Sequence, residues 1–396
     1  MLLFVAIAIF TPLYSYQQMI IILSIFCIWL VSSLVIDKHW VKMAINPLFL
    51  LCLIVLLDYI LGTFHHDTTA TLLGINKMPT FVWIIVLIFY TYHMKLVEEL
   101  IPIIVILMII SAIYTIIGNI EYPSASRLLA STGDDYYTET RSLYRELNIG
   151  GYGYIYSLVF AILPLGLISK KSSFFIKIFY ITSIVLFFIT IVLGAYMIGI
   201  LLVCTMLILL FVNPEKIKIT TIFTLFLCLF LLRFVFLDIL VSVGEQYDIT
   251  ALSKHAEELL SGTYSAGDKY NSRIHIYYNA ILNWLDSPIC GQLFGHVSSE
   301  YRRAGHSQLL DFLEKYGLFA YVYVMFLKYL YKFVMNGIRI NLMKKYYKLY
   351  YIVMIVFMFI NRFDTFMALG FMFFFFGPIL IKSADRRTLL QENINI

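Results

Sequence analysis

The amino-acid sequence predicts an all-α integral membrane protein that crosses the bilayer many times. Of its 396 residues, 61% are hydrophobic and 13% are charged, whereas soluble domains are roughly half apolar and about a quarter charged. The mean hydropathy of the chain is +0.86. The apolar residues form runs of roughly 20 residues, the length that an α-helix needs to cross a membrane. These features predict one transmembrane domain, residues 1–396, built as a helical bundle of about twelve spans.

Hydropathy along the chain places each span in turn. The expected segments lie near residues 2–14, 18–36, 47–62, 79–94, 99–118, 152–169, 174–192, 196–212, 219–240, 307–331, 349–361 and 365–381. The first segment is short, so it is either a span or a re-entrant segment. It lacks the basic start of a signal peptide, and further apolar segments follow it rather than a soluble domain.

Basic residues predict the orientation, because short loops rich in Lys and Arg stay cytoplasmic. The spans place one set of cations on a single side, namely Lys38, Lys42, Lys95, Lys170, Lys171, Lys216, Lys218, Lys344, Lys345, Lys348, Lys382, Arg386 and Arg387. We therefore expect both termini in the cytoplasm. The segments 63–78, 119–151 and 241–306 then lie outside, and the last two are long enough to be structured outer loops.

The sequence argues against nucleic-acid, metal and disulfide chemistry. The net charge of +5 is dispersed, without the basic, aromatic-studded module that nucleic-acid binding needs. Cys290 is the one cysteine outside the expected spans, which contain Cys27, Cys52, Cys204 and Cys228. His65, His66 and Asp67 form a tight cluster, but adjacent histidines do not share a helix face and no third ligand has diagnostic spacing. We expect no metal and no other cofactor.

The second outer loop contains a predicted amphipathic helix. Apolar residues recur at intervals of three and four at Ile274, Tyr277, Tyr278, Ile281, Leu282 and Leu285. Asn271 and Ser272 are suited to capping its start, and Pro288 follows its end. We expect this helix to lie on the membrane surface with Arg273 in its first turn. The glycine-punctuated stretch CGQLFG, Cys290 to Gly295, then leads the chain back towards His306.

His306 stands where this polar loop meets the next span, in the segment GHSQLLDFLEKYG, Gly305 to Gly317. Histidine is the side chain most readily poised to move a proton near neutral pH. At a helix start, the positive end of the helix dipole disfavours imidazolium and helps to keep the base free. The neighbouring Arg302 and Arg303 suit either an anionic substrate or lipid phosphate.

At this point the sequence resembles a known family. The order SR, amphipathic helix, SPICGQLFG, short basic loop and GHSQLLDFLEKYG is similar to the O-antigen polymerase and ligase superfamily of bacterial envelopes, over about 45 residues. The stretch NIGGYGYIYSLVFAILPLGLI, Asn148 to Ile168, adds a weaker likeness. The resemblance implies transfer of glycan from a polyprenyl diphosphate carrier at the outer face of the plasma membrane, with functional residues at His306 and Arg273.

The chain departs from the family at one place. Many members have an arginine at the outer end of an earlier span, where this chain has TIVLGAYMIG, Thr190 to Gly199, without charge. We expect Arg233 or Arg302 to hold the diphosphate instead. Arg233 lies within a span, where it either binds the diphosphate or extends to the interface near Asp238.

Two further residues are weaker candidates for substrate contact. Glu314 matches an acidic position frequent in the family, as an orienter of His306, a glycan contact or simply a hydrated carboxylate. Arg145 belongs to the first outer loop with Arg127, Arg141 and several acidic residues. That group is either a solvated salt-bridge network or part of the site.

These observations lead to a polysaccharide polymerase as the working hypothesis. It would be a multi-pass protein of the bacterial plasma membrane that acts on lipid-linked oligosaccharide at the outer side, among membrane lipids and with a chain-length regulator protein as a partner. The reaction would need no metal and would invert the anomeric centre. The alternatives are a ligase that delivers glycan to lipid A core or protein, a non-enzymatic flippase, and a membrane scaffold.

Overall fold

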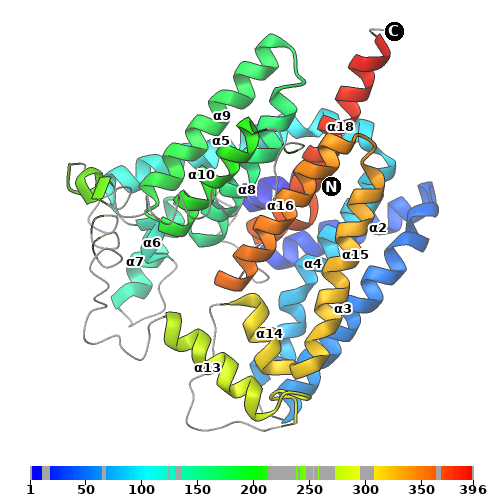
Figure 1. The fold of residues 1–396 in the computed structure, drawn as a ribbon, viewed down its shortest axis with the longest axis vertical. Coiled ribbons are helices and arrows are strands. Elements are labelled where there is room, and N and C mark those ends of the chain that lie inside the picture. Colours follow the sequence, from blue (N-terminus) through cyan, green and yellow to red (C-terminus); the bar gives the residue numbers. More distant parts are fainter. Residues whose placement is uncertain are drawn as a thin grey trace.

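The computed structural model describes residues 2–10, 18–64, 68–123, 125–129, 136–212, 214, 238–239, 241–246, 253, 257, 273–294, 307–362 and 367–394. Within these ranges the regular elements are helices and no strand occurs, which confirms the all-α prediction (Figure 1). The expected segment 219–240 lies almost entirely outside the described residues.

Helices occupy the other expected segments in chain order. Their bounds are α1 (Leu2–Phe10), α2 (Gln18–Ile36), α3 (His39–Phe64), α4 (Thr68–Tyr92), α5 (Met94–Glu121), α6 (Ala125–Leu128), α7 (Tyr136–Glu146), α8 (Tyr152–Ser169), α9 (Phe174–Leu193), α10 (Met197–Phe211), α13 (Arg273–Asp286), α14 (Gln308–Tyr316), α15 (Tyr321–Gly337), α16 (Asn341–Ile360), α17 (Met367–Phe371) and α18 (Gly377–Ile394). The 3₁₀ turn η2 (Gly317–Ala320) joins α14 to α15, and the π-helical turn η3 (Met372–Phe376) joins α17 to α18.

Among the described residues, six helices are long and apolar enough to cross a membrane. They are His39–Phe64, Met94–Glu121, Tyr152–Ser169, Phe174–Leu193, Gln308–Gly337 and Met367–Glu392. Other apolar helices are shorter, and α10 has 15 residues, or about 22 Å, against a hydrocarbon core of about 30 Å. The structure thus supports a membrane protein, and the number of about twelve spans stays a prediction.

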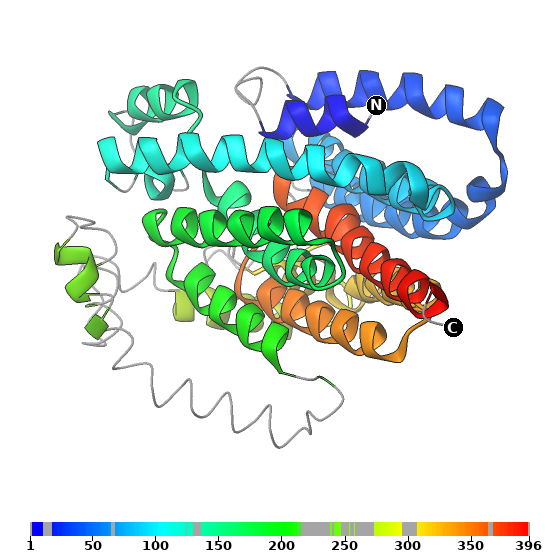
Figure 2. The same cartoon turned by 90° about the horizontal axis from the view of Figure 1, so that it is seen from above.

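α8 is the central helix of the bundle. It packs against α9, α10, α17 and α18 within the bundle (Figure 2), and each residue from Gly153 to Ser169 is buried. A helix covered on all sides is expected to be apolar all round, and α8 contains no charged residue. The ring of Phe160 joins α8 to its neighbours, because its centroid lies 5.3 Å from that of Phe357 and 4.6 Å from that of Phe373.

The outer helices have the opposite character. α3, α5 and α9 expose large apolar side chains, with 62% of Phe49, 55% of Ile117 and 53% of Val185 accessible. Extended apolar surface on a protein marks contact with another apolar phase. These faces are therefore suited to lipid.

One end of the bundle collects the basic turns, and we call it the basic end. Arg386 of α18 pairs with Glu98 of α5 at 3.6 Å. Arg387 donates a 2.8 Å hydrogen bond from Nη1 to Oγ of Ser172, between α8 and α9. His93 lies 3.6 Å from Asp37, which brings the start of α5 to the start of α3. These contacts bring α18 together with the segments around Lys38, Lys95 and Lys171, which the sequence assigns to one side.

The C-terminal helix is fastened at the basic end by Asp385. Its Oδ2 accepts a 3.0 Å hydrogen bond from the backbone N–H of Arg339, and its Oδ1 accepts a 2.8 Å bond from that of Ile340. Asp385 is buried. The carboxylate therefore satisfies two backbone donors of the turn between α15 and α16, which helix geometry leaves unpaired at a helix start.

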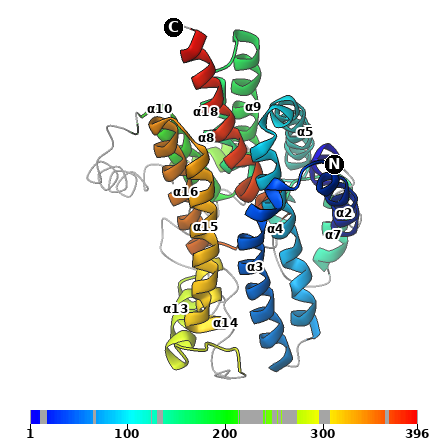
Figure 3. The same ribbon diagram turned by 90° about the vertical axis from the view of Figure 1, so that its right-hand side faces the viewer.

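The opposite end carries α13 and the start of α14, far from the C-terminal end of α18 (Figure 3). α6 and α7 also lie away from the C-terminus (Figure 1). We call this the α13 end, defined as α6, α7, α13, the start of α14 and residues 360–362. It contains the helices α6, α7 and α13, which come from the two long outer loops that the sequence predicts.

Candidate functional site

The amphipathic helix of the second loop is present as α13, Arg273–Asp286, directly after Ser272 and before Pro288. Its buried face includes Ala280 and Asn283, whereas Tyr278, Ile281 and Leu285 are exposed. The exposed residues share one side of the helix, because they follow each other at three- and four-residue intervals. An apolar stripe of this kind fits the expected contact with a membrane surface.

The turn after α13 packs directly on the end of α14. The backbone N–H of Gln292 donates to the carbonyl of Lys315 at 3.0 Å, and that of Leu318 donates to the carbonyl of Ile289 at 3.0 Å. Gly291 and Gly317 have positive φ angles of 57° and 56°. A Cβ on Gly291 would lie 2.5 Å from the carbonyl oxygen of Glu314. The described residues of the stretches SPICGQLFG and GHSQLLDFLEKYG, 287–294 and 307–317, therefore form one packed unit.

Glu314 lies at the centre of this unit. Its side chain is buried, with 1% of its surface accessible. Its Oε1 accepts hydrogen bonds from Nδ2 of Asn283 at 2.8 Å and from Nε2 of Gln292 at 2.9 Å. The carboxylate thus ties α13, the glycine turn and α14 together. From the sequence we expected Glu314 to contact substrate or His306. Residue types alone do not predict that Glu314 lies where α13, the glycine turn and α14 meet.

We expect Glu314→Ala to lower the unfolding temperature of the purified protein by on the order of 5 °C. The substitution leaves the buried Asn283 and Gln292 amides without a shared acceptor, at a cost of about 1–3 kcal/mol for each unsatisfied group. Fluorescence-monitored thermal unfolding in detergent measures the shift. Glu392→Ala, at an exposed position of α18, is the control and should leave the unfolding temperature unchanged. Identical unfolding curves for Glu314→Ala and Glu392→Ala would contradict this stabilising role of Glu314.

The start of α14 packs on the end of α16. Ser307 caps α14, because its hydroxyl accepts from the backbone N–H of Leu310 at 3.2 Å. The backbone N–H of Gln308 donates to the carbonyl of Asn361 at 3.3 Å. The phenol of Tyr277, one turn after Arg273 in α13, donates to the carbonyl of Ile360 at 2.6 Å. The first turns of α13 and α14 thus share residues 360–361 as a common support.

Arg362 is a cation at this support that the sequence reasoning did not single out. Its Nε lies 3.7 Å from Oδ2 of the buried Asp311, and 36% of its side chain is accessible. Its carbonyl accepts a 3.1 Å hydrogen bond from the phenol of Tyr152 at the start of α8. In the sequence, Arg362 is a single arginine near the end of an apolar run. An ordinary interfacial residue has the same pattern.

Described residues of 119–151, the segment that the sequence predicts as the first outer loop, form a second group of contacts at the α13 end. The guanidinium of Arg127 lies 5.5 Å from the ring centroid of Tyr196, whose phenol donates to the carbonyl of Ser126 at 2.7 Å. Arg127 therefore lies against the uncharged segment Thr190 to Gly199. A hydrogen bond with Glu121 and the charge of that carboxylate raise the pKa of Tyr122. The Tyr122 phenol thus stays protonated at neutral pH.

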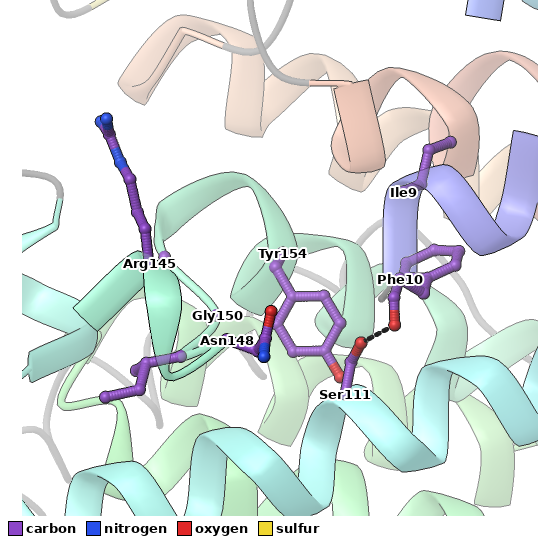
Figure 4. A pocket seen from close by; sticks show the side chains of 9 residues that line it. Ile9, Phe10, Ser111, Arg145, Asn148, Gly150 and Tyr154 are labelled. Atoms are coloured by element: carbon purple, nitrogen blue, oxygen red, sulfur yellow. Dashed lines mark hydrogen bonds between the residues drawn. The ribbon is translucent and has the colours of Figure 1, made fainter. Parts of the chain in front are cut away.

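Arg145 is exposed on α7 and borders a small pocket between α1, α5 and the start of α8 (Figure 4). The pocket volume is about 30 Å³, which is room for about one water molecule. The side chain of Arg145 extends away from Tyr154 and Ser111 in Figure 4. This pocket cannot hold a sugar, so the predicted substrate contact of Arg145 would have to occur on the open side of α7.

The remaining site predictions fall on parts that the structure does not describe. His306, Arg302, Arg303 and Arg233 lie outside the described residues, as do the cluster His65, His66 and Asp67. Arg273 is described as the first residue of α13, but its side chain is not. The structure therefore places the neighbours of the proposed catalytic residues, Ser307 after His306 and Tyr277 after Arg273.

No protein-family model, no curated protein and no solved structure matches this chain.

Proposed function

We propose that this protein is a membrane glycosyltransferase that polymerises polyprenyl-diphosphate-linked oligosaccharide into O-antigen or capsular polysaccharide. The observation that supports it most is the common support at residues 360–361. Tyr277 of α13 and Gln308 of α14 both bond to it, and these residues lie one turn after Arg273 and two residues after His306. A guanidinium and an imidazole at those positions have the chemistry that the transfer needs.

The reaction follows from the properties of these groups. A hydroxyl oxygen of the acceptor glycan attacks the anomeric carbon of the donor and forms a new glycosidic C–O bond. The C–O bond between that carbon and the diphosphate breaks, and the polyprenyl diphosphate leaves with the electron pair. Arg273, with Arg233 or Arg302, stabilises the leaving negative charge. His306 accepts the proton of the attacking hydroxyl, and direct displacement inverts the anomeric configuration.

A transporter of lipid-linked oligosaccharide is the less favoured alternative. Transport through a bundle requires polar or ionisable residues along a central path. The central helix α8 is apolar and buried along its length from Gly153. The described cations and carboxylates named above lie mostly at the two ends of the bundle, which favours chemistry at a surface over passage through the centre.

A deletion strain tests the polymerase directly and separates it from a ligase. Without a polymerase, the final acceptor should carry a single repeat unit, because transfer of unpolymerised units continues. Without a ligase, the acceptor should be bare while lipid-linked polymer accumulates. Electrophoresis of the envelope glycans distinguishes the two, and the intact gene on a plasmid should restore the ladder. An unchanged ladder in the deletion strain would reject both transferases.

A further inference from the structure

Arg362 lies where four helices meet at the α13 end. Its carbonyl bonds to Tyr152 of α8, and its guanidinium pairs with Asp311 of α14. The preceding residue, Asn361, accepts the backbone N–H of Gln308. Ile360, at the end of α16, accepts the phenol of Tyr277 from α13. The backbone beside Arg362 is therefore held by contacts from three other helices.

The guanidinium is held on one side and reaches solvent on the other. The ion pair with Asp311 uses Nε at 3.7 Å, and Asp311 is buried, with 6% of its side chain accessible. A guanidinium has five N–H donors, so a contact through Nε leaves donors for a ligand, and 36% of the Arg362 side chain is accessible. Because arginine presents its donors as a planar fork, it suits phosphate oxygens better than lysine does.

A second donor lies next to it. Asn361 is buried, with 4% of its surface accessible, and its Nδ2 has no hydrogen-bond partner among the residues that the structure describes. A buried amide donor without a partner costs free energy, which a ligand acceptor would recover. The first turn of α14 lies beside the same residue, because the backbone N–H of Gln308 donates to the carbonyl of Asn361, and the positive end of the helix dipole is at that turn.

From this arrangement we infer that Arg362, positioned by Asp311, is a binding residue for the diphosphate of a polyprenyl lipid. The inference rests on the proposed function and adds to it a cation that the sequence does not reveal. It places the anion beside the start of α14, at the support shared with α13. Asp311 acts as a positioning residue, since it fixes the Nε edge and turns the rest of the guanidinium outwards.

Binding to the purified protein tests the inference without turnover. The probe is undecaprenyl diphosphate, titrated into wild type, Arg362→Ala and Arg362→Lys in detergent. Arg339→Ala, which removes an exposed arginine at the basic end, is the matched control. We expect binding at least about tenfold weaker for Arg362→Ala, an intermediate value for Arg362→Lys and no change for Arg339→Ala. Equal binding by wild type and both Arg362 variants overturns the inference and leaves the proposed function standing.

Competitors identify the source of the anion. Inorganic pyrophosphate should compete with the probe in wild type and compete less in Arg362→Ala. Competition by undecaprenol, which has no phosphate, should be the same in wild type and Arg362→Ala. Phosphatidylglycerol competing as well as the probe would make Arg362 a headgroup contact and overturn the inference. Failure of wild type to bind undecaprenyl diphosphate at all would reject the inference and the proposed function together.

Asp311→Asn provides a second variant in case Arg362→Ala does not fold. It keeps the guanidinium of Arg362 and the shape of the side chain at residue 311 but removes the negative charge that orients Nε of Arg362. We expect weaker probe binding with an unchanged elution volume in size-exclusion chromatography, and an unchanged affinity would contradict the positioning role. Glycan transfer by the same variant should show a raised KM for donor with kcat less affected, as for a residue that binds rather than reacts.

Discussion

Polymer synthesis is expected to fall about a hundredfold to ten-thousandfold when His306 is replaced by alanine, the range typical of a lost general base. In the proposed mechanism the imidazole accepts the proton of the attacking hydroxyl. The measurement is the rate of chain extension by purified protein with a lipid-linked oligosaccharide, together with the length of the envelope polymer in cells.

The control for His306→Ala is His39→Ala, which removes an exposed histidine at the basic end. That variant should extend chains at the wild-type rate. Membrane insertion and the unfolding temperature of His306→Ala should match the wild type, because Ser307 rather than His306 caps α14. Full-length polymer from a normally inserted His306→Ala protein would remove His306 from the mechanism.

Gly317→Ala is expected to give the largest loss of stability. Gly317 has φ 56° and ψ −132°, a conformation that costs a residue with a side chain about 1–3 kcal/mol. A Cβ there would also lie 2.5 Å from the carbonyl oxygen of Ile289 and 2.6 Å from the backbone nitrogen of Gly291. Both obstacles are backbone atoms, so they cannot move aside as a flexible side chain does. We expect a lower yield of folded protein and loss of glycan transfer.

Gly199→Ala is the matched control for Gly317→Ala. Gly199 lies within α10, and a Cβ there would be 3.4 Å from the nearest atom, Cβ of Tyr196. Alanine in a helix is favoured over glycine by about 1 kcal/mol, so this variant should be at least as stable as wild type. Thermal unfolding in detergent compares the two, and a Gly317→Ala curve that overlays the wild type would show that the junction does not hold α14.

Hydropathy and periodicity were sufficient for the helical framework. α13 begins at Arg273, directly after the predicted capping residues, because its apolar spacing and the following proline are local signals. The helix in the expected span 196–212 ends after 15 residues, which is shorter than a full crossing of the hydrocarbon core requires. The count of spans depends on how much of each segment becomes helical, which local hydropathy does not determine.

The contacts of the candidate site could not be predicted in the same way. Glu314 binds Asn283 and Gln292 across loops of more than 20 residues, and Arg362 pairs with Asp311 across 51 residues of chain. Asp58, in the last third of α3, accepts a hydrogen bond from Tyr316. Such pairs form because helix packing brings two polar groups together. Neither hydropathy nor residue spacing in a single sequence indicates which polar groups will be neighbours in the folded protein.

The bond between Asp385 and the turn at residues 339–340 has a practical consequence for mapping topology. Reporter enzymes are commonly joined to C-terminally shortened chains, and any fusion point before Asp385 would release that turn from its acceptor. The reporter would then record the orientation of a chain in which the turn at residues 339–340 has lost these two hydrogen bonds. A reporter joined after the last residue leaves the hydrogen bonds between Asp385 and the turn at residues 339–340 intact. Single cysteines labelled from either side of the membrane can locate the inner loops.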